Sequence, residues 1–271
     1  MREEDPVALL RAYDAQLRVH MHEPLPDGVQ YERDGPLLRT LGFANRGWVE
    51  YRDLGGLDGA ELDELIARQV RIFAERGEQF EWKLHGHDRP PDLPERLRAA
   101  GLVPEEQETV VIAPVSVLGL EPSVPDGVVV REVSEPVDLQ RIAQLEEAVW
   151  GGEDHGWILD SLAKERTADP EGLRIFVAEA GDAVVCAAWV RFPSRTEFAT
   201  FWGGATLPAW RGRGIYRALV ARRARLAAER GRRYLETDAS DDSRPILERL
   251  GFVPVTTTTP YVWSPPVANR S

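Results

Sequence analysis

Two glycines and two arginines alternate at the entrance to a basic helical segment, in the stretch ATLPAWRGRGIYRALVARRARLAAERG at residues 205–231. Glycines between a strand and a helix let the backbone approach a ligand closely, and the start of a helix offers free N–H donors at the positive end of its dipole. Arg211 and Arg213 add fixed charge that could neutralise a pyrophosphate. The spacing predicts an anion site; a turn with solvated arginines is the alternative.

Two familiar phosphate motifs do not fit this loop. The chain contains no G-x-x-x-x-G-K-[ST] sequence, which excludes a P-loop. The dinucleotide fingerprint G-x-G-x-x-G needs a third glycine, but Arg217 stands at that place. The loop is therefore neither of these two nucleotide sites.

Apolar periodicity in the second half of the chain gives a clear order of elements around the loop. It predicts, in turn, a strand, a helix, three strands, a helix, a strand, a short helix and a last strand, at residues 127–133, 136–151, 173–180, 183–192, 197–208, 214–230, 233–239, 243–250 and 253–263. Gly181 and Asp182 mark a hairpin between two of the strands. This order is typical of an α+β layered domain with a mixed sheet.

The loop and the element order together resemble the GNAT N-acetyltransferase superfamily. Its acetyl-CoA signature, Gln/Arg-x-x-Gly-x-Gly/Ala between a strand and a helix, matches from Arg211 onward, with Tyr216 in the last place. The resemblance covers residues 127–271 and includes the short helix ending in LERLGF. It implies acetyl-CoA as co-substrate, with the pantetheine arm on the strand and the pyrophosphate on the loop. The residues concerned are Ala205, Thr206 and Leu207 for the arm, and Arg211, Gly212, Arg213, Gly214, Ile215, Tyr216 and Arg217 for the loop.

The resemblance also implies direct attack of a primary amine on the acetyl thioester, without a covalent acyl-enzyme. This chemistry needs a route for the ammonium proton and often an acid for the departing thiolate. Many family members have a tyrosine as that acid where this chain has Leu247. Tyr261 and Tyr216 are substitutes by residue type alone, and packing or cofactor contact is the alternative for each.

Acidic residues near the expected cleft are the candidates for the catalytic base. Strand alternation places Glu236 and Asp238 on one face, with Asp238 at the carboxyl end of its strand. Asp238 has a loop or helix-cap role as its alternative, and Glu197 is a third acid in the region.

In the family, residues 151–157 fall in the segment that shapes the acceptor site. The candidates there and on the next strands, for binding a cationic amine or forming its pocket, are Glu153, Asp154, His155, Trp157 and Trp202. A solvated loop and ordinary core packing are the alternatives for these residues.

The first half of the chain repeats part of the second. With a shift of 154 residues, eight of the thirteen residues in 65–77 are identical to those in 219–231, which predicts a tandem duplication. At the place of the Gly/Arg loop, residues 57–64 are LDGAELDE. Carboxylates at a helix N-terminus cannot form an anion site. The later arginines Arg222, Arg223 and Arg225 are not specific to the site, because arginines recur in the first half, where no CoA should bind.

The expected fold is therefore α+β, with tandem GNAT-like domains that are each a mixed, mostly antiparallel twisted sheet flanked by helices. Residues 1–120 are predicted to be a degenerate domain without the CoA loop, and residues 127–271 the acetyltransferase domain. The segment between them is rich in proline and glycine.

Composition limits the partners and the location. Net charge is -12, and residues 1–125 carry 14 basic and 24 acidic side chains against 19 and 21 in the remainder. This balance disfavours nucleic acid as a partner, and an acidic first half favours a cationic acceptor. The single cysteine, Cys186, lies in an apolar run and is expected to be a packed strand thiol, and no apolar run approaches the ~20 residues of a membrane span. We expect a cytoplasmic protein with no membrane partner, and no metal, because the pairs His20/His22 and His85/His87 lack further ligands.

The sequence thus predicts an acyl-CoA-dependent N-acyltransferase that moves an acetyl group from acetyl-CoA to a primary amine of a small, cationic molecule. The alternative is a CoA-binding sensor or protein-interaction module that has lost catalysis, which Leu247 motivates. The identity of the acceptor, the length of the acyl group, and the choice between monomer and homodimer stay open.

Overall fold

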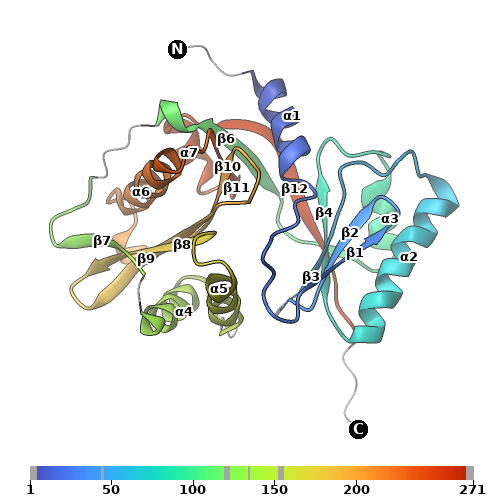
Figure 1. The fold of residues 1–271 in the computed structure, drawn as a ribbon, viewed down its shortest axis with the longest axis horizontal. Coiled ribbons are helices and arrows are strands. Elements are labelled where there is room, and N and C mark those ends of the chain that lie inside the picture. Colours follow the sequence, from blue (N-terminus) through green and yellow to red (C-terminus); the bar gives the residue numbers. More distant parts are fainter. Residues whose placement is uncertain (1–4, 44–45, 119–122, 134, 152–155, 267–271) are drawn as a thin grey trace, which may run out of the picture. The chain divides into compact units, whose positions relative to one another are not determined.

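The computed structural model describes residues 5–43, 46–118, 123–133, 135–151 and 156–266, which form two compact units (Figure 1). Unit 1 is built mainly from Val111–Pro254, together with His22–Asp27. Unit 2 is built from Val7–Met21, Gly28–Val110 and the segment from Val255 onward. The sequence predicts a single division near residues 120–127, but in the structure the last segment belongs with the first half of the chain.

Unit 1 contains a mixed sheet with the strand order β6–β11–β10–β9–β8–β7. Its strands are β6 (Glu108–Pro114), β7 (Val128–Glu132), β8 (Leu173–Ala180), β9 (Ala183–Arg191), β10 (Phe198–Thr206) and β11 (Tyr234–Ala239). β10 and β11 are parallel, whereas β7, β8, β9 and β10 pair in antiparallel fashion with one another in turn. The predicted hairpin turns between Ala180 and Ala183, at a glycine with φ of 56°.

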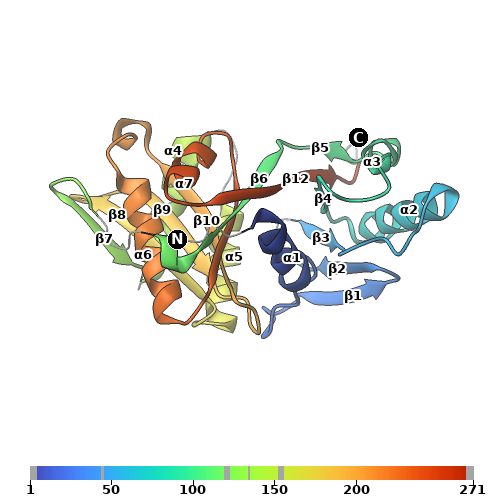
Figure 2. The same ribbon diagram turned by 90° about the horizontal axis from the view of Figure 1, so that it is seen from above.

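Helices cover both faces of this sheet (Figures 1 and 2). α6 (Ile215–Glu229) and α7 (Arg244–Arg249) lie on one face, and α4 (Pro136–Trp150) and α5 (Gly156–Ala168) lie on the other. Because side chains alternate along a strand, each face has its own core. The core under α6 and α7 includes Phe176, Cys186, Ala188 and Phe201, and the core under α4 and α5 includes Ile175, Ala187 and Trp189.

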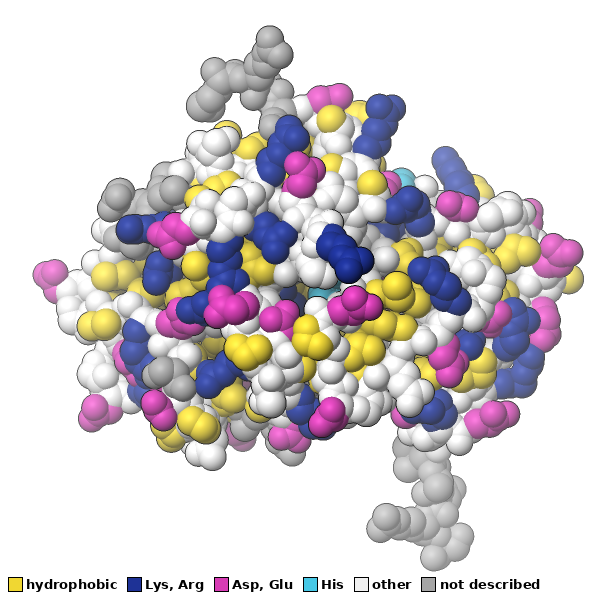
Figure 3. Space-filling model, viewed as in Figure 1, with side chains coloured by type: hydrophobic (Ala, Val, Ile, Leu, Met, Phe, Trp, Pro, Cys, Tyr) yellow, Lys and Arg dark blue, Asp and Glu magenta, His cyan; other side chains and the backbone are white. Residues whose placement is uncertain are grey.

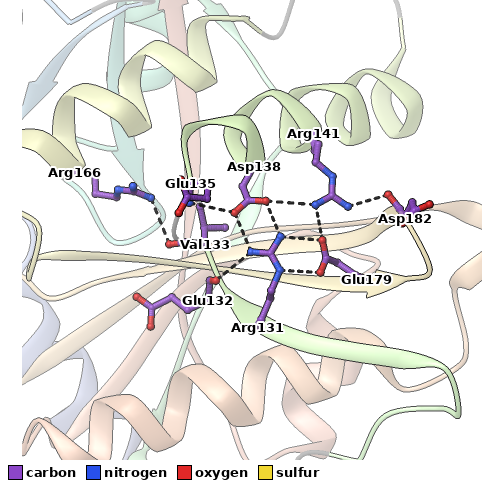
Figure 4. Close-up of polar contacts among 9 residues, drawn as sticks. All are labelled: Arg131, Glu132, Val133, Glu135, Asp138, Arg141, Arg166, Glu179 and Asp182. Atoms are coloured by element: carbon purple, nitrogen blue, oxygen red, sulfur yellow. Dashed lines mark hydrogen bonds and ion pairs between the residues drawn. The ribbon is translucent and has the colours of Figure 1, made fainter.

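An ion-pair network anchors the start of α4 to the edge of the sheet (Figure 4). Arg131 on β7 donates to both carboxylate oxygens of Asp138, at 2.8 and 2.6 Å, and to both of Glu179 on β8, at 2.7 and 2.9 Å. Arg141 also donates to Glu179, at 2.5 Å, and Glu135 forms a capping box with Asp138. Elsewhere, basic and acidic side chains are interspersed over the face drawn in Figure 3. The ion pairs of Arg131 therefore hold the start of α4 against the edge of the sheet.

Unit 2 contains strands with both parallel and antiparallel pairing, in the order β1–β2–β3–β4–β12, and β5 pairs with β12. Its strands are β1 (Gln30–Asp34), β2 (Leu37–Leu41), β3 (Gly47–Glu50), β4 (Phe80–His85), β5 (Val103–Pro104) and β12 (Val253–Trp263), and its helices are α1 (Pro6–Gln16), α2 (Gly59–Arg76) and α3 (Leu93–Ala99). From Thr258 to Trp263, β12 pairs antiparallel with β4. Trp263 packs with Phe73 and Phe80 in the core of this unit. The last strand therefore completes unit 2.

The two units repeat one order of elements, which confirms the tandem prediction. β3, α2, β4 and α3 of unit 2 correspond to β10, α6, β11 and α7 of unit 1, and in each unit the first and third of these are parallel neighbours. Gly77 after α2 has φ of 66° and Gly231 after α6 has φ of 67°. Leu97 of α3 and Leu247 of α7 are both completely buried. The repeat thus extends from helix ends to core positions.

Candidate functional site

β10 and β11 pair at one end and separate at the other. Their parallel pairing ends at Thr200, opposite Glu236. In the described part of the chain, the rest of β10 up to Thr206 pairs with β9 alone. The hydroxyl of Thr237 donates to the carbonyl oxygen of Phe201 at 2.9 Å, where the strands begin to part. One edge of β10 is therefore open, and an open strand edge can bind an extended ligand through main-chain hydrogen bonds.

A β-bulge bends β10 within this open part. The register with β9 shifts between Gly203 and Ala205, and the φ angles of Gly203 and Gly204 are 70° and 116°. A Cβ atom on Gly203 would lie 2.5 Å from the ring of Trp189, and one on Gly204 would lie 2.8 Å from the ring of Tyr216. Glycine is required at both positions, because the backbone is left-handed there and an aromatic ring occupies the place of a side chain.

The three residues predicted to line the pantetheine arm lie just after the bulge. Ala205 is 4% exposed, and the hydroxyl oxygen of Thr206 lies 3.1 Å from the Sγ atom of Cys186. The main-chain N–H of Leu207 donates to Val185 at 3.0 Å, so this amide faces β9 and not the open edge. Cys186 is buried, as its apolar run predicts. Burial raises the pKa of its thiol to about 11.

The Gly/Arg loop connects β10 to α6 and is exposed to solvent. Arg211 donates from Nε to the carbonyl oxygen of Thr206 at 3.2 Å, and the guanidinium of Arg213 lies 4.7 Å from the ring centre of Trp210. Gly212 has φ of 73°, and no heavy atom would lie within 4 Å of a Cβ placed on it. The loop thus exposes backbone and positive charge together.

The N-terminus of α6 has the donors that an anion needs. Gly214 is its N-cap, with φ of 83°; no side chain of the described residues caps this helix, and its first turn contains no acid. The first three amides, those of Ile215, Tyr216 and Arg217, have no acceptor within a helix because of its geometry. They lie at the positive end of the helix dipole. The side chain of Arg217 is exposed beside them.

A pocket of about 210 Å³ lies along α6 on the same side as Arg217. Its lining is apolar apart from this arginine and one serine, and consists of Leu118, Ser123, Arg217, Ala218, Val220, Ala221 and Leu250.

The two candidate bases lie on the sheet face that α4 and α5 cover. Glu236 pairs in register with Thr200, and Asp238, two residues further on, is on the same face. Glu236 is 7% exposed. In parallel register, Asp238 is level with Trp202, beyond the point where β10 and β11 separate. Glu236 therefore lies where the pairing of β10 and β11 ends, and Asp238 lies where the two strands have separated.

Trp202 is a rigid but exposed side chain at the same mouth. It is 45% exposed, and its indole N–H donates to the hydroxyl of Thr200 at 2.9 Å. The guanidinium of Arg191 lies 4.6 Å from its ring centre and is itself held by Glu165 through two hydrogen bonds of 2.6 and 2.8 Å. Its neighbours thus fix the orientation of the indole, which is the property expected of a pocket wall.

One other acid, Glu197, is placed less favourably for chemistry. It precedes β10, at the end opposite the loop, and its carboxylate lies 3.7 Å from the guanidinium of Arg233. In the turn that leads into α7, the Oγ atom of Ser240 accepts the amide of Ser243 at 3.3 Å.

Tyr261, a candidate for the acid, and Leu247, which stands where many family members have that acid, are both buried. Tyr261 is 2% exposed in the core of unit 2, opposite Trp82, with the guanidinium of Arg98 5.5 Å from its ring centre. This corrects its expected position in the second domain, since this part of β12 belongs to unit 2 and pairs with β4. Leu247 is completely buried in the core under α6 and α7. Packing explains both residues.

Part of the predicted acceptor segment lies outside the described residues. This applies to Glu153, Asp154 and His155. Trp157 lies in α5, and its side chain is likewise outside the described part.

The equivalent loop of unit 2 has a different chemistry, as its acids predict. Asp58 is the N-cap of α2 and accepts the amide of Gly59 at 2.6 Å. Asp63 binds Arg96 at 2.8 Å, and Glu61 lies in the first turn. The helix start is thus filled by the protein's own carboxylates, which compete with any anion.

The histidine pairs also have local partners. His85 lies 2.9 Å from the hydroxyl of Tyr13, and burial lowers the pKa of its imidazole far below the usual range. His87 lies 2.8 Å from the hydroxyl of Thr256. Among the described residues there is no cluster of three or more metal-ligating side chains, and no helix there has both the length and the apolarity to cross a bilayer.

Comparison with known proteins agrees with the geometry of this loop and strand. Residues 171–254, which include β8 to α7, match the acetyltransferase (GNAT) domain. This segment is a GNAT domain. No curated protein sequence matches the chain.

Solved structures share the tandem GNAT fold over nearly the whole chain. A GCN5-related N-acetyltransferase from Kribbella flavida has a TM-score of 0.64 at 18% identity, covering 96% of this chain and 94% of its own. A tandem GNAT protein from the clavulanic acid biosynthesis pathway has a TM-score of 0.63 at 15% identity, with the same coverage. A GCN5-related N-acetyltransferase from Sphaerobacter thermophilus has a TM-score of 0.60 at 14% identity, covering 95% and 85%. These likenesses show the fold, and the match to the acetyltransferase (GNAT) domain supports acyl transfer in general.

Two features of this region, the β-bulge and the buried Arg223, were not predicted from the sequence. Gly203 and Gly204, adjacent within a strand, are the signal for the bulge, because glycine in a strand often marks one. Arg223 differs from Arg222 and Arg225 in being 1% exposed, and it bonds to β9 and β10. Its neighbours in sequence carry no signal that separates it from them, since burial depends on which face of α6 meets the sheet.

Proposed function

We propose that unit 1 transfers an acetyl group from acetyl-CoA to the primary amine of a small, cationic molecule. The observation that carries the proposal is the open edge of β10 leading directly into an uncapped, arginine-flanked helix N-terminus. An extended amide-containing arm and a pyrophosphate, joined in one ligand, need these two features in this order.

The residues present fit acetyl-CoA. The main chain of Ala205 and Thr206 would bind the arm, and the amides from Gly212 to Arg217 would bind the pyrophosphate, with charge from Arg211 and Arg213. The pocket along α6, about 210 Å³ in volume and lined by Arg217 and Ser123 among apolar residues, would lie beside the bound pyrophosphate. Unit 2 has no such place at its acidic helix start, so we assign it no cofactor.

When bound, acetyl-CoA would supply an acyl group activated as a thioester. The acceptor nitrogen would bond to the acyl carbon as the carbon–sulfur bond breaks and its electron pair stays on sulfur. We assign Asp238 to take the proton that the nitrogen loses, directly or through water, because it is level with the mouth of the opening. Glu236 would add negative charge that favours a cationic acceptor, and Trp202 would be one wall of its pocket.

The cofactor assignment is tested by charge reversal at the loop. We expect acetyl-CoA to raise the melting temperature of the wild-type protein. The variant Arg211→Glu/Arg213→Glu should weaken CoA binding about 100-fold or more, because each charged hydrogen bond contributes about 1.5–3 kcal/mol. Arg222→Glu/Arg225→Glu is the matched control, since it makes the same charge change further along the helix. Equal CoA affinity in the two double variants would refute the assignment.

The transfer itself is tested by thiol release from acetyl-CoA with a panel of polyamines, aminoglycosides, amino-sugar thiols and peptide N-termini. Asp238→Asn should lower kcat about 100-fold or more with the best amine. Asp241→Asn is its control, since the side chain of Asp241 is 82% exposed on the following turn. An unchanged kcat in Asp238→Asn would remove Asp238 from the mechanism.

A second function, a CoA sensor without turnover, is favoured by one observation. Leu247, at the place of the usual acid, is completely buried and cannot deliver a proton. CoA binding without thiol release across the whole panel would support the sensor, and thiol release with any amine would exclude it.

A further inference from the structure

Arg223 is a charged side chain in the interior of unit 1. It is 1% exposed, and its guanidinium lies 4.2 Å from the ring centre of Phe201. Its Nε donates to the carbonyl oxygen of Leu219 at 3.1 Å. Within the described residues, no carboxylate forms an ion pair with it. Methionine or leucine could fill this space without the cost of desolvating a charge, so the guanidinium must satisfy a need that an apolar side chain would not.

The need is found at the β-bulge. Nη1 of Arg223 donates to the carbonyl oxygens of Trp189 and Trp202, at 3.1 and 3.3 Å. These two residues are paired on β9 and β10, one residue pair before the shift in register that begins at Gly203. The bulge interrupts the ladder of hydrogen bonds just beyond this pair. Arg223 therefore binds both strands from α6 next to the interruption.

Tyr216 lies against the other side of the bulge. A Cβ atom on Gly204 would be 2.8 Å from its ring. Tyr216 and Arg223 are seven residues apart on α6, which places them on one face of the helix. Burial raises the pKa of Tyr216, so the phenol keeps its proton.

Unit 2 shows what the equivalent position does without a cofactor loop. The 154-residue shift maps Arg223 to Gln69, which is also fully buried. Its Nε2 donates to the carbonyl oxygen of Leu65 at 3.0 Å, as Arg223 does to Leu219. Gln69 also donates to the carboxylate of Asp34 and accepts from the guanidinium of Arg39. Both of these partners are side chains, whereas the strand partners of Arg223 are main-chain carbonyl groups. The bond from the helix to two strand carbonyls thus accompanies the half that has the Gly/Arg loop.

We propose that Arg223 and Tyr216 are positioning residues that hold the bulged, open part of β10 in the shape to which the pantetheine arm of acyl-CoA binds. This inference rests on the proposed function. Tyr216 stands where the GNAT signature has a small residue, and Gly204 leaves room for its ring. The pair acts through the backbone of β10 and does not itself contact the reacting atoms.

The test measures CoA binding by calorimetry and the melting temperature without ligand for four single variants. Arg223→Met removes the donors and keeps the volume, and should weaken CoA binding about tenfold, the loss expected for one to two hydrogen bonds. Arg223→Lys should recover affinity to within about threefold of the wild type, because an ammonium can still donate to the carbonyls. Tyr216→Ala, which removes the ring that packs against Gly204, should weaken binding about threefold. Arg225→Met, an exposed arginine on the same helix, should bind as the wild type does.

Three outcomes overturn the inference. A folded Arg223→Met with wild-type CoA affinity does so, whatever its melting temperature, because the role would then be structural. If Arg223→Met does not fold, Tyr216→Ala decides, and wild-type affinity in that variant has the same meaning. Independent, additive losses in the double variant Arg223→Met/Tyr216→Ala would deny that the two act as a unit. Failure of the wild type to bind CoA would instead refute the proposed function, and this inference with it.

Discussion

Replacing Arg131 by methionine should destabilise unit 1 by about 2 kcal/mol. Arg131 makes hydrogen bonds of 2.6–2.9 Å to Asp138 and Glu179, whose side chains are 3% and 17% exposed. Removing one partner of a buried ion pair costs about 3–5 kcal/mol. Two facts reduce the figure here: Arg131 is itself 32% exposed, and Arg141 still reaches Glu179 at 2.5 Å. With a urea m-value of about 2 kcal/mol/M, the midpoint should fall by about 1 M.

The effect should also depend on pH in a defined direction. The hydrogen bond from Arg131 holds the pKa of Glu179 below its usual value. A carboxyl group whose pKa is lowered by folding contributes stability above its unfolded pKa and loses it as pH falls through the folded pKa. The difference between wild type and Arg131→Met should therefore be largest at neutral pH and shrink in acid.

Urea unfolding followed by circular dichroism, at neutral and acidic pH, measures both effects. Arg225→Met is the control, because Arg225 and Glu229 form a pair that is half exposed on both sides and should contribute under 1 kcal/mol. Equal midpoints for Arg131→Met and Arg225→Met would refute the reasoning, and so would a difference that grows in acid.

Three further predictions follow from single positions. Gly214→Ala should cost about 1–2 kcal/mol in urea unfolding and also weaken CoA binding, because the φ of 83° is unfavourable for a residue with a Cβ atom; unchanged affinity would argue against a close approach of ligand to this backbone. Leu247→Tyr, which restores the family's residue type, should destabilise by about 1–3 kcal/mol because no space surrounds the buried leucine, and a wild-type melting temperature would contradict this. Asp34→Asn should destabilise unit 2 by about 1 kcal/mol at neutral pH, after allowance for the 40% exposure of Arg68. Arg68 lowers the pKa of Asp34 to about 2, so the effect should fade between pH about 4 and about 2, and a loss that persists below that range would show another cause.

Local patterns in the sequence predict most of the elements of unit 1. The helix expected at 214–230 is Ile215–Glu229, and the strand expected at 233–239 is Tyr234–Ala239. The last strand is also found where its alternating pattern places it, at Val253–Trp263. Its partner was not predictable, because a periodic pattern reports which face is buried and not which strand lies alongside. This is why the sequence places Tyr261 in the wrong unit.

The candidate site is predictable in part for a similar reason. The loop from Arg211 to Arg217 is recognisable because its chemistry is local: glycine, charge and a helix start in one stretch. The bulge needs Trp189 and Tyr216 at the same backbone, from two other elements, and Arg223 matters because it reaches two strands at once. Contacts that join distant segments leave little trace in any one of them.

The place of β12 has a consequence for the order in which the protein can form during synthesis. Val111–Pro254 leaves the ribosome as one continuous segment, so unit 1 can close around its core while the chain is still growing. Unit 2 must wait for Thr258–Trp263, made last, to pair with β4, although most of its chain is made first. The half with the acidic helix start is thus translated early and completed late, and its open β4 edge needs protection from other chains in the meantime.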